Sequence, residues 1–507
     1  MLYQILKDTS KRFPNKIAVV DNNKRYTYHE LLLLTDLIAD SLLKIGMKKG
    51  NRLAFYLYNC PQIILCYFAC FKIGVTVIPV NYRLKEDEAH YIIDHSKPTV
   101  LISQKRLFFQ IADNISELPS IEQSYLIDSE EAYRDTLPFS DLLSPAESII
   151  ASNKIPPKTE AVVLYTSGTT GKPKGAILAH DQMMIHTVNH CKLVEYKSDD
   201  KTLVCLALSN NFAFSHQMLS ALYSGATLEI NASFDPSEVL EKIEKNGITM
   251  LYMMPVMFHA LNQQAAVKEL PILNQLRLAV VAGDKTPLIV LDQFQKIFGL
   301  EMCEGIGMTE TQIYALNPLG KGKKIGSMGV PVTYTEVQIQ DEKGKASPAG
   351  RTGEISVRGD IIMKSYLNNP EVTAESYRNG WFLTGDLGYF DDDGYLWFRG
   401  RKKQLILHDG SNISPQEIEE VFYHHPAVFE VGVIGILDKI EGEMVYAFVT
   451  KKPEFETVNE QELYAFSKKH LADYKVPERI IFLDTLPKSA TGKLDRKRLK
   501  YYGVNNG

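Results

Sequence analysis

The first part of the chain, residues 1 to about 160, alternates between helical and strand-like hydrophobic patterns. Residues 28–46 ("YHELLLLTDLIADSLLKIG") carry apolar side chains at helical spacing, whereas three short apolar runs are typical of buried strands: 52–58, 75–80 and 98–102. The same rhythm continues through four later runs, at residues 200–208, 226–230, 248–254 and 276–284. Helices that alternate with such strands predict layered, parallel sheets in an α/β fold.

The hydrophobic pattern changes between residues 325 and 400. Short alternating segments are separated there by Gly and Asp turns, which predicts a small antiparallel, barrel-like sheet closing the large unit. After Gly400 the pattern restarts as a compact α+β module. The sequence therefore predicts a large N-terminal domain (1–400), a charged hinge (401–404) and a small, mobile C-terminal domain (405–507).

The C-terminal module begins with a helix signal at residues 414–425. Ser414 is a candidate N-cap, Pro415 takes the first helical position and Glu417 completes a capping box. Two strand-like runs and a helix near residues 460–472 follow, before a polar tail.

Composition and charge exclude several classes of protein. At 507 residues, with 45% apolar and 23% charged residues, the chain fits an ordinary globular protein of two or more domains. The formal charge of −5 and the lack of a broad basic stripe argue against a nucleic-acid partner.

Cysteine usage and the chain's start indicate a reducing environment. The sequence shows no C-x-x-C pair and, in this interpretation, no His cluster at zinc-ligand spacing, so neither a disulfide framework nor a zinc site is expected. Residues 1–16 lack the order of a signal peptide, and no run of about 18 uncharged apolar residues is present. We therefore expect a cytoplasmic protein without a transmembrane segment.

A loop rich in glycine, hydroxyl and lysine groups occupies residues 165–175 ("YTSGTTGKPKG"). Backbone N–H groups, short hydroxyls and ammonium groups all donate to phosphate oxygens, so this composition predicts a phosphate-binding loop. A Walker loop has Ser or Thr directly after its Gly-Lys pair, whereas Pro173 follows Lys172 here. Apolar runs on both sides argue against a solvated linker.

Four further motifs follow in order: "GIGMTE" (305–310), "GWFLTGD" (380–386), "GRKKQLILHDGSNISPQEIE" (400–419) and "PKSATGKLDR" (487–496). With these motifs and the loop, the chain resembles the adenylate-forming superfamily of acyl-CoA synthetases, adenylation domains and luciferases over nearly its whole length. The resemblance implies a two-step reaction in which a carboxylate and ATP give acyl-AMP and pyrophosphate, and a thiol then takes the acyl group. The implied cofactors are ATP, Mg²⁺ and CoA as co-substrate.

The resemblance also assigns the nucleotide-binding residues, which lie in the loop, in "AGD", in "GIG" and around "TGD". They are Thr166, Ser167, Gly168, Thr169, Thr170, Gly171, Gly283, Asp284, Ile306, Gly307, Asp386 and Arg401. Asp386 matches the residue that accepts hydrogen bonds from both ribose hydroxyls, a task suited to a carboxylate with two oxygens.

Four residues match catalytic positions of the superfamily. Lys174 adds positive charge at the phosphates, and Thr309 touches the α-phosphate. Glu310 matches the Mg²⁺ ligand, since Mg²⁺ prefers one or two carboxylates together with phosphate oxygens. Lys493 resembles the lysine that bridges the attacking carboxylate and the α-phosphate. An alternative for "MTE" taken alone is a helix N-terminus with Thr309 as a cap.

Lys493 lies in the C-terminal domain, so the resemblance implies that this domain closes over ATP as a lid. It implies a second orientation for thioester formation, in which Gly410 lets the backbone approach the pantetheine arm and Gln404 acts as the hinge residue.

Several positions depart from the superfamily's usual residues. Ile306 replaces an aromatic ring against adenine, Gln404 replaces a charged hinge residue, Asn210 replaces a histidine beside the acyl tunnel, and Asp409 replaces a glycine on the thiol route. None of these departures removes Lys493, so we expect an active enzyme.

By the same resemblance the acyl pocket is lined by Phe212, Phe214, Met253, Val281, Cys303 and Ile306. These side chains are apolar or soft, which favours a monocarboxylic fatty or aryl acid over an amino or dicarboxylic acid. Three alternatives remain open: a stand-alone enzyme that loads a carrier protein's phosphopantetheine, a luciferase-like oxidase and a non-catalytic acyl binder. Basic residues near Lys402 and Lys403 modestly favour CoA as the acceptor.

Overall fold

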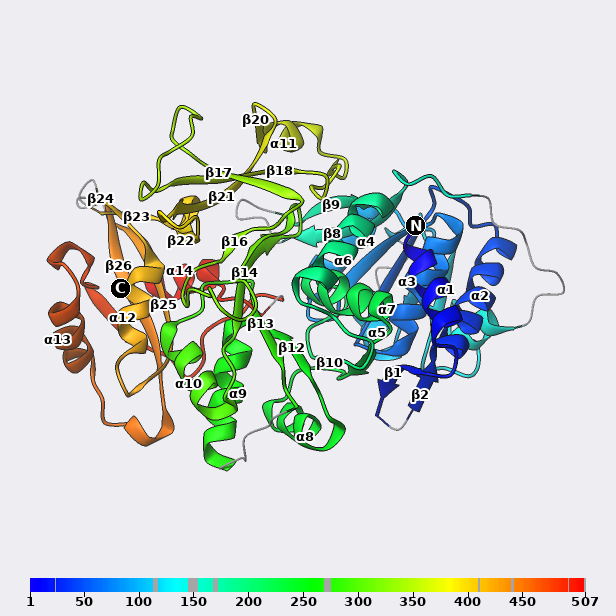
Figure 1. The fold of residues 1–507 in the computed structure, drawn as a ribbon, viewed down its shortest axis with the longest axis horizontal. Coiled ribbons are helices and arrows are strands. Elements are labelled where there is room, and N and C mark those ends of the chain that lie inside the picture. Colours follow the sequence, from blue (N-terminus) through cyan, green and yellow to red (C-terminus); the bar gives the residue numbers. More distant parts are fainter. Residues whose placement is uncertain are drawn as a thin grey trace.

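The structure is a computed structural model that describes residues 1–22, 24–112, 117–144, 154–166, 172–268, 275–408, 411–438, 442–490 and 492–505. Within these residues the strands form four sheets. Figure 1 shows a large unit that holds the N-terminus and a smaller unit, coloured orange to red, that holds the C-terminus. The expected mixed α/β fold with a small C-terminal domain is confirmed.

The first sheet forms one half of the large unit. Its central strands run parallel, and antiparallel strands lie at both edges. In sheet order the strands are β16 (Val330–Pro331), β15 (Gln312–Leu316), β14 (Cys303–Met308), β13 (Leu278–Val281), β12 (Met250–Met253), β10 (Lys201–Val204), β11 (Thr227–Ile230), β1 (Ile17–Asp21) and β2 (Lys24–Thr27).

The second sheet forms the other half, with five parallel pairings and two antiparallel ones. In order its strands are β19 (Ser365–Tyr366), β9 (Lys174–Ala179), β8 (Glu160–Thr166), β4 (Thr76–Asn81), β3 (Arg52–Leu57), β5 (Val100–Ser103), β6 (Gln123–Leu126) and β7 (Thr136–Pro138). The apolar runs predicted as buried strands thus form the parallel parts of both sheets.

The main hydrophobic core joins these two sheets. Helix α3 (Pro61–Ile73) is buried around nearly its whole circumference, as expected for a helix whose sequence is apolar on every side. Its Tyr67 packs edge-to-face on Phe55 of β3, with ring centroids 5.1 Å apart, and stacks on Phe214 at 4.5 Å. Cys66 and Cys70 lie on the same helix, and all six cysteines of the chain are buried and free.

Helices connect the strands of these sheets, and several of them pack in the main core together with both sheets. The helix predicted from residue 28 is α2 (Tyr28–Lys44), which begins with a capping box between Thr27 and Glu30. The other helical elements of the large unit are α1 (Leu2–Arg12), α4 (Glu86–Ser96), α5 (Lys105–Ala112), η2 (Phe139–Leu143), α6 (His180–Leu193), the π-helical η3 (Phe212–Leu219), α7 (Ser220–Ser224), α8 (Pro236–Asn246), α9 (Pro255–Lys268), α10 (Leu288–Phe298) and α11 (Pro370–Glu375).

A third, antiparallel sheet follows where the sequence pattern changes. It consists of β17 (Thr335–Gln340), β18 (Gly353–Gly359), β21 (Trp381–Phe390), β20 (Tyr377–Arg378) and β22 (Leu396–Arg401). The predicted antiparallel sheet between residues 325 and 400 is therefore confirmed.

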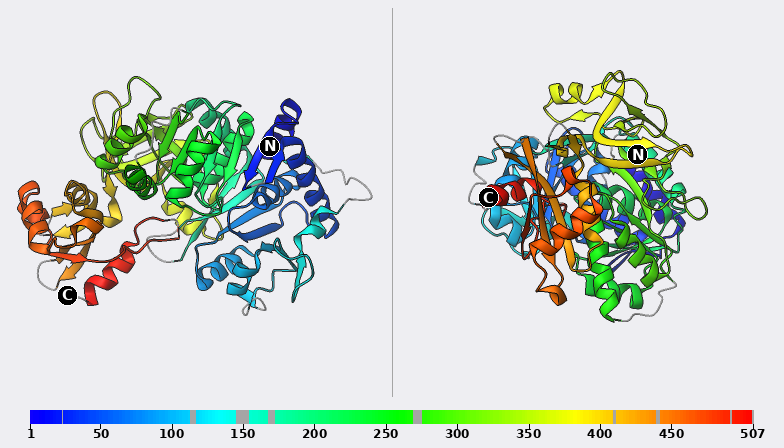
Figure 2. Two further views of the ribbon diagram at one scale, coloured as in Figure 1. Left: turned by 90° about the horizontal axis from the view of Figure 1, so that it is seen from below. Right: turned by 90° about the vertical axis from the view of Figure 1, so that its left-hand side faces the viewer.

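The fourth sheet belongs to the smaller unit. Its strands are β24 (Ser411–Ile413), β23 (Ile406–His408), β26 (Gly442–Lys451), β25 (Val428–Asp438) and β27 (Arg479–Phe482). The helical elements around it are η4 (Lys402–Gln404), α12 (Pro415–Tyr423), η5 (Pro453–Phe455), α13 (Glu460–His470), η6 (Asp473–Lys475) and α14 (Arg496–Asn505). In Figure 2 the segment before α14, in red, extends from this unit toward the large one.

The capping box expected at Ser414 is wrong, although α12 begins where predicted. Ser414 is the N-cap residue, but its side chain makes no capping bond. Its Oγ donates instead to the backbone oxygen of Arg399, at 2.8 Å, and Glu417 pairs with Lys475. The Ser414 side chain therefore makes a tertiary hydrogen bond in place of the local capping bond.

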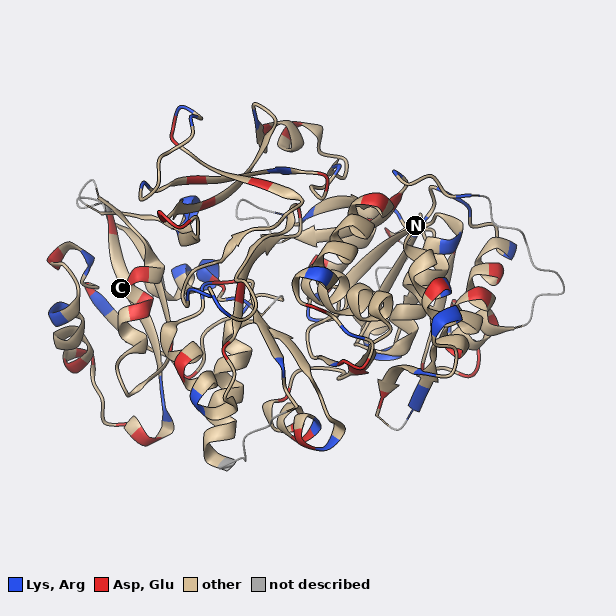
Figure 3. Cartoon of the chain, in the orientation of Figure 1, with Lys and Arg blue, Asp and Glu red and all other residues tan. Residues whose placement is uncertain are grey.

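Acidic and basic residues are intermixed along the described elements (Figure 3). Among the helices that the structure describes, none is both long and apolar enough to cross a membrane.

Candidate active site

The Glu310 carboxylate lies buried in a tight turn between β14 and β15. Its Oε1 accepts hydrogen bonds from Thr166 Oγ1, at 3.2 Å, and from the hydroxyl of Tyr366, at 2.8 Å. Both of these donors bind Oε1, so among the described residues Oε2 is the oxygen left to bind a ligand. The turn joins antiparallel strands through the pair Met308 and Gln312, which excludes the alternative that "MTE" opens a helix.

The ends of the phosphate-binding loop lie next to this carboxylate. Thr166 and Lys174 face each other across β8 and β9, so the strand pair fixes where the loop begins and ends. Lys174 Nζ lies 5.4 Å from the ring centroid of Tyr366, the residue that also donates to Glu310. The loop residues Ser167, Gly168, Thr169, Thr170 and Gly171 lie outside the described residues.

Gly307 and Ile306 lie on β14, just before this turn. A Cβ atom on Gly307 would lie 2.5 Å from the backbone oxygen of Gln312, so a side chain does not fit there. Ile306 is buried in the main core cluster. The backbone oxygen of Thr309 accepts from Gln312 Nε2, which holds the turn in place.

Asp386, which is buried, and Arg401, which is partly exposed, form an ion pair on the third sheet. They face each other across β21 and β22, and Arg401 Nε lies 3.1 Å from Asp386 Oδ1. Burial raises the pKa of Asp386, which is only 4% exposed, although Arg401 and Lys493 oppose that shift. The carboxylate of Asp386 raises the pKa of Arg401 in turn.

Lys493 reaches this site from the smaller unit. Asn81 Nδ2 on β4 donates to the backbone oxygen of Ala490, at 3.2 Å, and anchors the segment that carries the lysine. A Cβ atom on Gly283 would lie 3.7 Å from Lys493 Cε, so a glycine at 283 leaves room for the lysine stem. Gly283 and Asp284 follow the carboxyl end of β13, the edge where parallel sheets bind ligands.

The charges around Lys493 come from all parts of the site. Burial lowers the pKa of Lys493, and the nearby Arg401 lowers it further. The carboxylates of Asp284, Asp386 and Glu310 act in the opposite direction. The structure therefore brings these five residues within electrostatic range of one another.

A cavity of about 90 Å³ lies where the two units meet beside Lys493. Polar side chains from both units line it, among them Asp284, Lys285, Glu419, Lys493 and Arg496. Polar contacts also close the interface: Glu420 accepts from the backbone N of Leu288 at 2.9 Å and pairs with Lys285 at 3.5 Å.

The residues expected in the acyl pocket do not form a single group. Met253 and Val281 face each other across β12 and β13 in the main core, and Phe214 is fully buried against Tyr67. Cys303 belongs to a separate cluster that includes Tyr252 and Val280, with Phe212 packed against it.

The expected hinge residue lies in a short 3-10 turn. Gln404 Oε1 accepts from Gln416 Nε2 at 3.4 Å, so an amide pair stands where a charged hinge residue is usual. Asp409 and Gly410 lie outside the described residues.

Sequence reasoning missed two features. Tyr366 joins Lys174 to Glu310, and nothing in its local sequence indicates this role. Three buried histidines also lie together, namely His186, His190 and His216. The expectation of no His cluster at metal-ligand spacing is wrong, because His186 and His190 are four residues apart on α6 and so share one helix face.

Glu304, on β14 near the site, is expected to make protein stability depend on pH. Burial raises its pKa to about 8 from an ordinary value of 4.5. From pH 5 to 8 the unfolded chain releases this proton while the folded chain keeps it, so the free energy of unfolding falls as pH rises, by up to about 1.4 kcal/mol per pH unit. Glu304→Gln should remove this slope. Denaturant unfolding of both proteins at pH 5, 6.5 and 8 checks this prediction. If the free energy of unfolding changes with pH by the same amount in both proteins, the prediction is contradicted.

Two family models match the chain. The model described as "AMP-binding enzyme" matches residues 6–367, which is more than half of the chain. The model described as "AMP-binding enzyme C-terminal domain" matches residues 417–493.

Known relatives match nearly the whole chain. A 2-succinylbenzoate–CoA ligase from Bacillus licheniformis is 32% identical over 496 residues, covering 97% of this chain and 98% of that protein. A long-chain-fatty-acid–CoA ligase from Bacillus subtilis is 32% identical over 532 residues, covering 98% of this chain and 94% of that protein. The solved structure of O-succinylbenzoate coenzyme A synthetase from Bacillus subtilis, in complex with ATP and a magnesium ion, has a TM-score of 0.85 and 29% identity, covering 98% of this chain and 99% of that one. The chain therefore belongs to the AMP-binding enzyme family, as an AMP-forming acid–thiol ligase of the acyl-CoA synthetase type.

Proposed function

We propose that this ligase activates a monocarboxylic fatty or aryl acid with ATP and transfers the acyl group to CoA. In the first step an oxygen of the acid attacks the α-phosphorus of ATP, the bond to the β-phosphate breaks, and acyl-AMP and pyrophosphate form. In the second step the CoA sulfur attacks the acyl carbon and AMP leaves. The observation that carries the proposal is the position of Lys493, which lies beside Gly283 and within electrostatic range of Glu310 and Asp386.

The site's charges suit the first step, in which two anions must approach each other. Lys174, on β9, and Lys493, in the C-terminal unit, would offset charge at the phosphates and at the attacking carboxylate. The Asp386 carboxylate would accept hydrogen bonds from the ribose hydroxyls, and Arg401 would hold that carboxylate in place. Thr309 would contact the α-phosphate.

Magnesium fits the donors at Glu310. The buried carboxylate has Thr166 and Tyr366 on Oε1, which orients Oε2 for a hard cation. When bound together with phosphate oxygens, Mg²⁺ supplies positive charge that stabilises the leaving pyrophosphate.

The second step concerns the C-terminal unit. We propose domain boundaries at 1–400 and 405–507, with a hinge at 401–404 around Gln404 that lets the unit turn after acyl-AMP forms. Gly410 would then lie beside the pantetheine arm that carries the thiol. The polar character of the interface supports reversible closure, since such contacts exchange readily with water. The six free, buried cysteines support a reducing, cytoplasmic location.

Product analysis tests the proposed function. The protein is incubated with ATP, Mg²⁺, CoA and a pool of fatty and aryl acids, and the products are identified by mass spectrometry, with CoA omitted as a control. We expect acyl-CoA and AMP. Acyl-AMP without a thioester would reject CoA as the acceptor and favour a carrier protein, and no AMP release with any acid would reject the proposal.

A reducible cross-link tests whether the C-terminal unit must turn. Asn81→Cys combined with Ala490→Cys joins two positions that are in contact, and the six native cysteines are buried. We expect the cross-linked protein to form acyl-AMP but almost no acyl-CoA, and reduction to restore thioester formation. The reduced double variant is the matched control. Full acyl-CoA turnover in the cross-linked state would contradict domain rotation.

A further inference from the structure

Three histidine side chains lie side by side in the interior of the large unit. His186 and His190 come from one face of α6, and His216 comes from η3. The ring centroid of His216 lies 4.5 Å from that of His186 and 4.8 Å from that of His190. His186 and His190 are fully buried and His216 is 4% exposed, so bulk water does not serve these rings.

The three rings have hydrogen-bonding atoms to spare. His190 Nε2 contacts the Tyr252 hydroxyl at 3.2 Å, and His216 Nδ1 contacts Ser215 Oγ at 2.8 Å. Both ring nitrogens of His186 and Nδ1 of His190 have no hydrogen-bond partner among the described residues. A buried polar atom without a partner is destabilising, so several in one place point to an absent ligand.

The rings are neutral at neutral pH. Burial lowers the pKa of His186 and of His190 well below the ordinary value, and lowers that of His216 to about 4. A neutral imidazole offers one donor and one acceptor. The cluster therefore suits an uncharged oxygen group that both donates and accepts, and it offers no charge to balance a second carboxylate.

The cluster lies against the face of the first sheet where part of the acyl pocket is expected. Tyr252, Val280 and Cys303 are neighbours across β12, β13 and β14. Phe212 packs on the rings of both Tyr252, at 5.8 Å, and His216, at 5.3 Å. From Cys303, β14 continues directly to Thr309 and Glu310. The strand that begins at Cys303 thus ends at the turn that holds the proposed adenylation residues.

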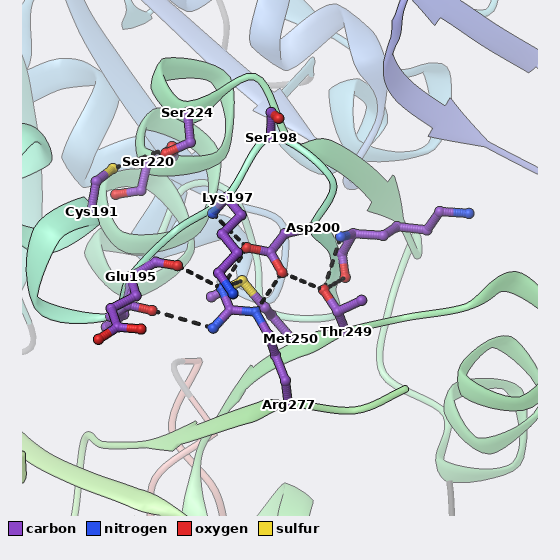
Figure 4. A network of polar contacts seen from close by, with 12 residues as sticks. Cys191, Glu195, Lys197, Ser198, Asp200, Ser220, Ser224, Thr249, Met250 and Arg277 are labelled. Carbon is purple, nitrogen blue, oxygen red and sulfur yellow. Dashed lines mark hydrogen bonds and ion pairs between the residues drawn. The ribbon is translucent and has the colours of Figure 1, made fainter. Parts of the chain in front are cut away.

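A polar network fixes the end of the helix that carries two of these histidines (Figure 4). Arg277 Nη2 donates to the backbone oxygen of Glu195, just after α6, at 3.0 Å, and Arg277 Nε donates to the buried Asp200 at 2.6 Å. Asp200 also accepts from Thr249 Oγ1 at 2.9 Å, beside the start of β12. These contacts tie the end of α6 to the residues just before strands β10 and β12. The imidazoles are therefore held in place before a ligand arrives.

We propose that His186, His190 and His216 form the far end of the acyl pocket and select an acid with a hydroxyl group remote from the reacting carboxylate. The inference rests on the proposed function and narrows its substrate class. An acid without the hydroxyl would leave the same imidazole nitrogens unpaired, which lowers kcat/KM for adenylation by about 10- to 100-fold.

Matched acids test the subsite. Pyrophosphate release is compared for 3-(4-hydroxyphenyl)propanoic against 3-phenylpropanoic acid, and for 10-hydroxydecanoic against decanoic acid. We expect the hydroxy acid of at least one pair to be preferred. His186→Phe should abolish or reverse that preference, and His186→Gln, which keeps hydrogen-bonding atoms, should retain part of it.

A control variant and a second measurement keep the test decisive. His180→Phe changes another buried histidine of α6, one that packs on Phe71 and has no hydrogen-bond partner in the described part of the chain. It should leave the preference unchanged. If His186→Phe does not fold, the test rests on the ratio of kcat/KM for the hydroxy acid to kcat/KM for its matched acid. This ratio is then compared between the unaltered protein and His186→Gln.

Each remaining outcome overturns the inference. Equal use of both acids in each pair, unchanged by His186→Phe, would overturn the subsite while the proposed function stands. Three imidazoles are also a ligand set for zinc. One equivalent of zinc in the purified protein that is lost in His186→Phe would therefore replace the subsite with a metal site. If none of the acids leads to release of AMP, the proposed function is rejected together with the subsite.

Discussion

Lys493→Ala should slow acyl-AMP formation by about 10²- to 10³-fold, the typical effect of removing one group that stabilises charge in the transition state. The ε-ammonium group lies near Arg401 and three carboxylates. We propose that the attacking carboxylate and the α-phosphate meet there. ATP–pyrophosphate exchange measures the step. Thioester formation from supplied acyl-AMP should stay near that of the unaltered chain, because the proposed turn of the C-terminal unit moves this lysine away before that half-reaction.

Lys497→Ala is the matched control, since it removes the same charge from an exposed position four residues further along. It should leave both half-reactions unchanged. Normal exchange by Lys493→Ala would remove the lysine from the mechanism, and equal loss in both half-reactions would indicate a structural role instead.

Glu310→Gln should lower kcat/KM for adenylation by about 10²- to 10³-fold and raise the Mg²⁺ concentration needed for half-maximal rate. The amide oxygen can still accept hydrogen bonds from Thr166 and Tyr366, so the turn should keep its geometry while the negative charge is lost. Magnesium titrations of pyrophosphate release measure both effects.

Glu304→Gln provides the comparison for Glu310→Gln. Glu304 is also buried and precedes the same turn, but it hydrogen-bonds to the backbone N of Gly326 and holds its proton up to a pKa of about 8. Its substitution should leave the magnesium dependence unchanged. A Glu310→Gln protein with normal magnesium dependence would mean that the cation has another ligand.

The layered fold could be predicted from the sequence because buried parallel strands and amphipathic helices leave local hydrophobic patterns. The motif residues were also readable, since Glu310, Asp386 and Lys493 lie in short segments of distinctive composition. The sequence did not predict the distances between these segments in space. Asn81 and Ala490, for example, are 409 positions apart and nevertheless form a hydrogen bond.

Local patterns failed where a partner comes from elsewhere in the fold. Ser414 has the sequence of a helix cap, but Arg399 supplies a competing acceptor across the interface between strand and helix. His186 and His190 are spaced so that they share one helix face, but the cluster of three forms only with His216, which lies on another element.

The position of Lys493 after the last strand of the fourth sheet, β27, affects when the protein becomes active during its synthesis. Domains generally fold in order as the chain leaves the ribosome. A nascent chain that has completed the first three sheets already carries Glu310, Asp386 and Arg401, but it lacks the lysine proposed to join acid and nucleotide. An unfinished chain is therefore expected to bind ATP without releasing a reactive acyl adenylate into the cell.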